Sequence, residues 1–147
     1  VGYTEKAFEI LRRMIPGPDE KDLIQRGQLP VFVPNYYRGA YRQFPRTAGK
    51  SSQLFNTGAA PWLYRCLIDG LFGLRGDVDG LHLNPRLPKE WNRAEAIREF
   101  RGATFKVNIQ RESGISKTRV KVDDSLLQEQ VIKDIQPRIY NVDIRIP

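Results

Sequence analysis

Residues 61–91, PWLYRCLIDGLF followed by GLRGDVDGLHLNPRLPKEW, divide this chain into a helical part and a β part. The first twelve residues open with a proline, which favours the start of a helix, and they are apolar on nearly every side. Gly73 then offers a helix stop, and leucines recur at spacings of two and four among Gly, Asp and Pro. We therefore predict a helix buried in a larger helical assembly, with a different kind of structure after it.

Strand patterns fill the region after this change. In residues 104–109, apolar side chains alternate with polar ones, as expected of half-buried antiparallel strands. Arg101-Gly102 and Ser113-Gly114 are predicted turns. The predicted strands are residues 97–100, 104–109, 119–122 and 139–146. Residues 75–147 therefore read as an antiparallel, β-sandwich-like module.

A second helix is predicted near the start of the chain, over residues 4–15, TEKAFEILRRMI. Thr4 is the predicted N-cap, Glu5 suits the first turn, and Arg12 and Arg13 suit the last. The following Pro-Gly-Pro ends the helix. Its broad apolar face predicts that it packs against neighbours.

Composition narrows the class of protein. The 147 residues are one domain's worth or parts of two, and 40% of them are hydrophobic, enough for a packed core. The net charge is +7, but the basic residues are scattered rather than clustered, which argues against a nucleic-acid partner and fits small anionic substrates better.

Cysteine and histidine are too few for several kinds of site. One cysteine, Cys66, excludes an internal disulfide and a Cys-based zinc site, and we expect its thiol to be buried and inert. One histidine, His82, excludes a His-pair metal site. No apolar run is long enough for a membrane span. The chain opens inside a helical pattern without Met, so we expect a fragment, with a cytoplasmic location by default.

Residues 19–60 are irregular and contain many aromatic and basic side chains. Flat rings beside fork-shaped donors suit a carbohydrate site, but the same rings could instead hold a long loop against its own domain. The residues concerned are Phe32, Tyr36, Tyr37, Tyr41 and Phe44, interleaved with Asn35, Arg38, Arg42 and Gln43.

The end of this region, residues 46–62, RTAGKSSQLFNTGAAPW, leads into the apolar helix. Thr57-Gly58 before a helix start offers a hydroxyl, an unhindered backbone and the positive end of the helix dipole, which suits phosphate. Arg46 and Lys50 could grip a carboxylate or phosphate, or could be solvated loop cations.

Other polar residues have simpler interpretations. Asp77 and Asp79 are flanked by glycines, so a turn explains them better than a catalytic pair. His82 is expected at the surface or on an edge strand, and Trp91 as a core anchor. The residues themselves predict a binding loop and no general acid.

Three ordered motifs, NTGAAPW, LRGDVDGLHLNPRLPKEW and FRGATFKVNIQR, resemble the carboxyl-terminal part of the inverting disaccharide phosphorylases, family 94 of the glycoside hydrolases. The resemblance covers roughly the whole chain. It implies an α+β fragment in which residues 1–74 are the last helices of an (α/α)6 barrel, including a substrate and phosphate loop at 30–60. Residues 75–147 would be the carboxyl-terminal β segment.

The resemblance also implies site residues. Thr57 and Gly58 match a Thr-Gly pair that helps to hold phosphate, although Ala59 stands where relatives often have a hydroxyl. Arg46 and Lys50 resemble the branch that acts on cellobionic acid, where an Arg and a Lys recognise the gluconate carboxylate.

The implied reaction is reversible, inverting phosphorolysis of cellobionic acid to α-D-glucose 1-phosphate and D-gluconate. The general acid, an Asp, would lie upstream, so this chain alone is expected to be inactive. No metal or organic cofactor is implied, phosphate is a substrate, and a homodimer is expected.

Two alternatives remain open. The same family includes enzymes that act on cellobiose or another β-glucoside, and the phosphorylase-like end of a cyclic β-glucan synthase. A different class is a non-catalytic carbohydrate-binding module.

Overall fold

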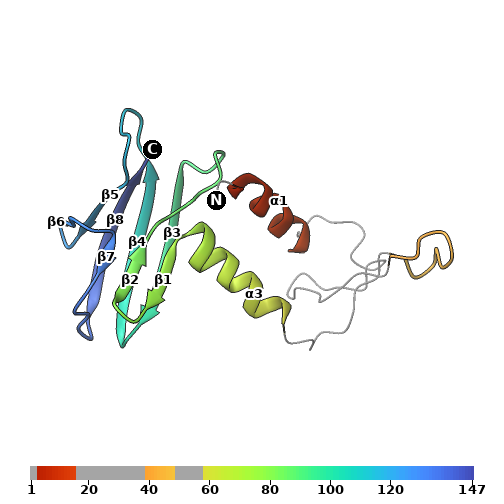
Figure 1. Ribbon diagram of the computed structural model, residues 1–147, viewed down its shortest axis with the longest axis horizontal. Coiled ribbons are helices and arrows are strands. Elements are labelled where there is room, and N and C mark those ends of the chain that lie inside the picture. The colour runs from red at the N-terminus through yellow and green to blue at the C-terminus, as the bar shows by residue number, and fades with distance from the viewer. Residues whose placement is uncertain (1–2, 16–38, 49–57) are drawn as a thin grey trace. The chain divides into compact units, whose positions relative to one another are not determined.

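A computed structural model describes residues 3–15, 39–48 and 58–147. The chain forms two compact units, Tyr3–Arg65 and Cys66–Pro147 (Figure 1). The assignment of residues 1–74 to the end of a barrel stays a prediction.

The first helix, α1, spans Thr4–Met14, as predicted except for its cap. Thr4 is the first helical residue rather than the N-cap; Tyr3 occupies the cap position and makes no side-chain cap hydrogen bond. On the exposed side of α1, Arg13 and Glu9 lie one turn apart and form an ion pair. Leu11 is buried, whereas Ile10 is 58% exposed.

The second helical stretch begins earlier than predicted and changes its winding. Helix α3 spans Ala59–Arg65, so Pro61 is its third residue. A π-helical turn, η1, follows over Cys66–Leu71, and the Phe72 N–H donates to the Leu67 carbonyl oxygen at 2.8 Å. Gly73 then adopts a φ of +65°, which confirms it as the helix stop.

The apolar side chains of α3 are not covered by the described residues, whereas Leu71 of η1 is buried. Trp62 is 67% exposed, and none of the residues of α3 is buried. Burial in a larger helical assembly therefore stays a prediction. Cys66 is exposed, so the expectation of a buried thiol is wrong for this chain.

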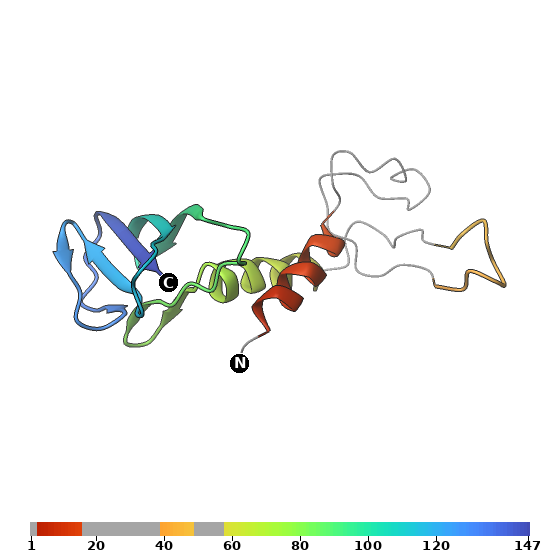
Figure 2. The same cartoon turned by 90° about the horizontal axis from the view of Figure 1, so that it is seen from above.

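After η1, the second unit consists of two sheets and their connections (Figures 1 and 2). The smaller has the order β1-β2-β7, and the larger has the order β3-β4-β8-β5-β6. The small-sheet strands are β1 (Leu74–Asp77), β2 (Gly80–Leu83) and β7 (Val131–Ile132). The large-sheet strands are β3 (Arg93–Phe100), β4 (Ala103–Arg111), β8 (Ile139–Ile146), β5 (Arg119–Val122) and β6 (Ser125–Leu126).

The four predicted strands are confirmed as β3, β4, β5 and β8, with β3 and β4 longer than predicted. One pairing differs from the antiparallel expectation: β4 and β8 are parallel. Parallel neighbours need a long crossover, and here the chain between them forms β5, β6 and β7 before it returns.

Side chains from both sheets form one hydrophobic core. Leu74, Leu81 and Leu83 come from the small sheet and are fully buried, as are Phe105 and Ile109 of β4. The sandwich-like arrangement follows, because each sheet turns its apolar face to the other. Trp91 packs against the core and meets Phe72 edge to face, as predicted for a core anchor.

Candidate functional site

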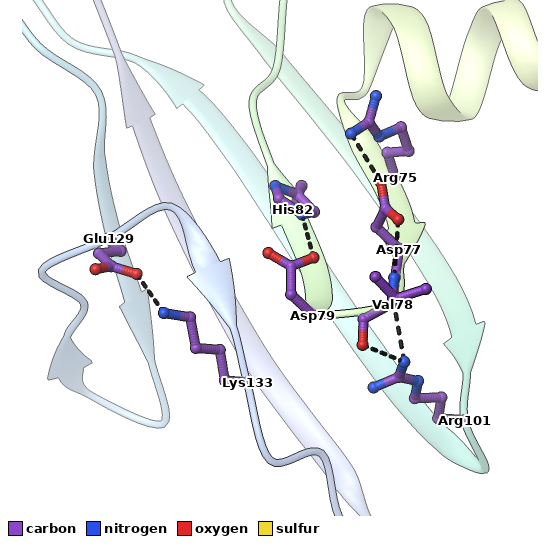
Figure 3. Close-up of polar contacts among 8 residues, drawn as sticks. All are labelled: Arg75, Asp77, Val78, Asp79, His82, Arg101, Glu129 and Lys133. Atoms are coloured by element: carbon purple, nitrogen blue, oxygen red, sulfur yellow. Dashed lines mark hydrogen bonds and ion pairs between the residues drawn. The ribbon is translucent and has the colours of Figure 1, made fainter.

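The β1–β2 hairpin carries a group of polar side chains on the face opposite the core. Because Leu74, Leu81 and Leu83 point inward, the pleat places Arg75 and His82 outward, directly opposite each other in register. Arg75 donates to the Asp77 carboxylate at 2.9 Å (Figure 3). Residues 78 and 79 form the turn, so the turn interpretation of Asp77 and Asp79 is confirmed.

His82 is held by a neighbour from the same turn. Its Nε2 lies 2.8 Å from Asp79 Oδ1 (Figure 3). An ionised carboxylate only accepts, so Nε2 carries the proton, and in the neutral ring Nδ1 is an acceptor. His82 is half-buried, as expected near a surface, but β2 is the central strand of its sheet, so the edge-strand alternative is wrong.

This hydrogen bond from His82 is the main cause that lowers the pKa of Asp79 below its ordinary 3.8, and the charge of Lys133 acts in the same direction. Asp79 is therefore ionised at neutral pH and has no proton to give. Asp79 therefore cannot serve as a general acid, and the wider expectation that this chain contains none stays a prediction.

Two further contacts fix the surroundings. Arg101, at the β3–β4 turn, donates to the carbonyl oxygens of Asp77 at 3.1 Å and Val78 at 2.8 Å, so one hairpin turn holds the other (Figure 3). Lys133 donates to Glu129 at 2.6 Å. Their hydrogen bond raises the pKa of Lys133 and lowers that of Glu129.

A cavity of about 270 Å³ opens beside this hairpin. Within the second unit, η1 contributes one wall, the cross-strand pair Arg75 and His82 contributes another, and the extended residues after β2 contribute a third. The lining residues are Asp69, Gly70, Gly73, Arg75, His82, Asn84 and Arg86.

Sequence reasoning did not single out Asp69, Asn84 or Arg86. A signal existed for two of them: apolar residues or proline alternate with polar residues from Leu81 to Leu87, which places Asn84 and Arg86 on the same face as His82. No local pattern could have placed Asp69 beside them, because that depends on how η1 folds back onto β1.

The predicted binding residues belong to the first unit. Arg46 is exposed on a turn in which the N–H groups of Thr47 and Ala48 both donate to the Phe44 carbonyl oxygen at 3.0 Å. The Gly58 carbonyl oxygen accepts from the Trp62 N–H at 3.1 Å, which makes Gly58 the N-cap of α3. Lys50 and Thr57 lie outside the described residues, and the roles of all four stay predictions.

Within residues 3–15, 39–48 and 58–147, no group of three or more His, Cys, Asp or Glu side chains could hold a metal ion. None of the helices in these ranges is long and apolar enough to cross a membrane.

Known proteins resemble this chain over nearly its whole length. A family model described as "Glycosyl hydrolase family 65, C-terminal domain" matches residues 74–124. The chain is 54% identical over 144 residues to "Cellobionic acid phosphorylase" of Neurospora crassa, covering 97% of this chain and 18% of that protein. The chain belongs to the disaccharide phosphorylases.

Other relatives are less similar to this chain. It is 32% identical to "3-O-beta-D-glucopyranosyl-beta-D-glucuronide phosphorylase" of Paenibacillus borealis, over 82% of this chain and 16% of that protein. It is 34% identical to "Cyclic beta-(1,2)-glucan synthase" of Rhizobium meliloti, over 54% of this chain and 3% of that protein. The chain spans less than a fifth of the length of each of these relatives.

Proposed function

We propose that this chain is part of a phosphorylase that converts cellobionic acid, 4-O-β-D-glucosyl-D-gluconate, and phosphate into α-D-glucose 1-phosphate and D-gluconate. The observation that supports this most is 54% identity to a cellobionic acid phosphorylase across 97% of the chain. A second relative is named for a glucuronide substrate, which also carries a carboxylate. Both relatives are thus named for a substrate with a carboxylate, which supports an acidic sugar as the substrate here.

The reaction exchanges two bonds at the anomeric carbon. A phosphate oxygen forms a bond to that carbon from the face opposite the leaving group, and the glycosidic C–O bond breaks, so the configuration inverts. A general acid Asp, outside this chain, gives its proton to the departing gluconate oxygen. Phosphate takes the place that water has in an inverting hydrolase.

The chain's own residues would handle the two anions. Arg46 and Lys50 bind the gluconate carboxylate, and Thr57 with the Gly58 backbone helps to seat phosphate at the start of α3. Such groups offset the repulsion between an anionic nucleophile and an anionic substrate. The exposed position of Arg46 and the N-cap position of Gly58 are compatible with these roles.

The finer architecture belongs to the same proposal. Residues 1–74 are the last helices of an (α/α)6 barrel, which would cover the apolar surface that α1 and α3 leave exposed. The enzyme uses no cofactor, works in the cytoplasm as a homodimer, and needs the upstream Asp, so this chain alone is inactive.

Replacing Lys50 by Ala in the full-length enzyme tests the carboxylate assignment. Losing a charge-assisted hydrogen bond of about 1.5–3 kcal/mol should lower kcat/KM for cellobionate by roughly 10- to 150-fold. Any turnover of cellobiose, which has no carboxylate, should not change. Lys117→Ala, at an exposed position in the loop between β4 and β5, is the matched control and should leave both substrates unaffected.

Two results would contradict the proposal. Unchanged turnover of cellobionate in the Lys50→Ala enzyme would show that the carboxylate is bound elsewhere. A wild-type enzyme that phosphorolyses cellobiose or a cyclic glucan better than cellobionate would reassign the substrate within the family.

A further inference from the structure

The cavity beside the β1–β2 hairpin contains polar groups that the described residues leave unpaired. The side chains of Asp69, Asn84 and Arg86 all line it, and none makes a hydrogen bond or ion pair with another residue in the described part of the chain. Asp69 and Arg86 have opposite charges and share the cavity, yet they are not joined as an ion pair. Among the described residues, no ion pair closes the space between them, which leaves room there for a ligand.

The remaining walls are held in place. Arg75 is bound to Asp77, and His82 is bound to Asp79, so both are oriented by partners on their own hairpin (Figure 3). The Arg101 contacts hold the turn that carries those partners. A site whose walls are fixed before binding loses less entropy when a ligand enters.

The chemistry of the lining decides the kind of ligand. Asp77 offsets the charge of Arg75, and the remaining pair, Asp69 and Arg86, has no net charge, which gives a fixed anion such as phosphate little advantage. Asp69 accepts hydrogen bonds, Arg86 donates them, and Asn84 does both. Neighbouring sugar hydroxyls, each a donor and an acceptor, match such a set.

Size points the same way. Pockets for drug-sized ligands hold about 300–1,000 Å³, and this one, at about 270 Å³, lies just below that range. Gly70 and Gly73 carry no side chains, so a ligand can approach the η1 backbone closely. One pyranose ring is an appropriate occupant.

We propose that this cavity binds one sugar unit of a carbohydrate, at a non-catalytic site separate from the loop that contains Arg46 and Lys50. The inference does not depend on the proposed phosphorolysis. It rests on a lining of mixed donors and acceptors whose charges offset one another, held in place by the hairpin contacts.

Hydrogen exchange of the full-length protein, read by mass spectrometry, tests this site by location. D-glucose should protect amides in residues 66–86, with an affinity on the order of 1 mM for so small a ligand. Arg86→Ala and Asp69→Asn should each abolish that protection. Arg119→Ala, exposed on β5 of the other sheet, is the matched control and should retain it.

Inorganic phosphate and D-gluconate, tested as separate probes, should not protect residues 66–86. Protection by phosphate but not by glucose would overturn the sugar assignment, and so would no protection by any probe. Phosphorolysis is assayed in parallel. Protection without phosphorolysis would overturn only the proposed function, whereas phosphorolysis without protection would overturn only this site.

Discussion

Asp123 holds the β5–β6 turn against β8 with both of its carboxylate oxygens. Oδ1 accepts from the Asn141 N–H at 2.9 Å, and Oδ2 accepts from Arg138 at 2.6 Å. Asp123 and Asp124 both have positive φ, at 46° and 68°, a geometry that Asp and Asn tolerate in tight hairpin turns. The hydrogen bond from Asn141, followed by that from Arg138, lowers the pKa of Asp123 below 3.8.

Asp123→Asn should therefore destabilise the fold in a pH-dependent way. At pH 7 the loss of the charge should lower the free energy of unfolding by about 1 kcal/mol. Because the folded pKa is lowered, the aspartate's contribution is present above its unfolded pKa and is lost as the pH falls through the folded value. Urea unfolding at several pH values should show the difference closing below pH 3.8.

Asp124→Asn is the control for this measurement, since it preserves the same backbone preference and its side chain makes no hydrogen bond within the described residues. It should change stability little at any pH. A wild-type advantage over Asp123→Asn that stays constant from pH 7 to below pH 3 would show that charge at Asp123 is unimportant.

Single residues were predictable where the local sequence sets their environment. The glycines around Asp77 and Asp79 predicted the turn, and the alternating strand predicted that His82 faces outward. Exposure of Cys66 was not predictable, because apolar neighbours on a helix do not say which of them the rest of a protein covers. The Asp79–His82 bond needed the hairpin register as well.

At the scale of elements, the junction between η1 and β1 depends on Gly73. Its φ of +65° lets the chain leave the π-helical turn and enter the strand. A β-carbon at this position would lie 2.0 Å from the Asn84 carbonyl oxygen, which belongs to backbone that cannot move cheaply. Asn84 in turn donates its N–H to the Gly73 carbonyl oxygen at 2.9 Å.

Gly73→Ala should thus lower the free energy of unfolding by more than backbone strain alone would. We expect a loss of at least about 3 kcal/mol, of which about 1–2 kcal/mol is the left-handed conformation and the rest is the steric conflict. Gly114→Ala isolates the strain, because Gly114 has a φ of +85° and nothing within 4 Å of the added carbon. Chemical unfolding of both variants measures the difference, and equal losses would contradict the close approach at Asn84.

Elements with strong periodicity were predictable, and their long-range pairing was not. Phe105, Val107 and Ile109 alternate with polar residues, so β4 was predicted from the sequence alone. Its parallel pairing with β8 joins residues about 35 positions apart, such as Thr104 and Ile139. Nothing in either strand records that the chain between them forms three other strands first.

At the scale of the whole molecule, the two units differ in how their apolar residues are covered. The core of both sheets lies entirely within residues 66–147, where Phe105 and Tyr140 stack with ring centroids 4.9 Å apart. In α1 and α3, by contrast, Ile10 and Trp62 are more than half exposed. The change in sequence character near residue 74 predicted the β module, whereas burial of the helices in a larger assembly stays a prediction.

The second unit should accordingly fold by itself. A polypeptide of residues 66–147 has a closed core of side chains from two sheets, so we expect one cooperative urea transition with a slope of about 1 kcal/mol/M. Phe105→Ala should lower its stability by roughly 3–5 kcal/mol, because the side chain is fully buried. Residues 1–147 should show the same transition but bind more of a hydrophobic dye, since the helix surfaces stay uncovered. A gradual transition for residues 66–147, or equal dye binding by the two polypeptides, would mean that the helices complete the β core.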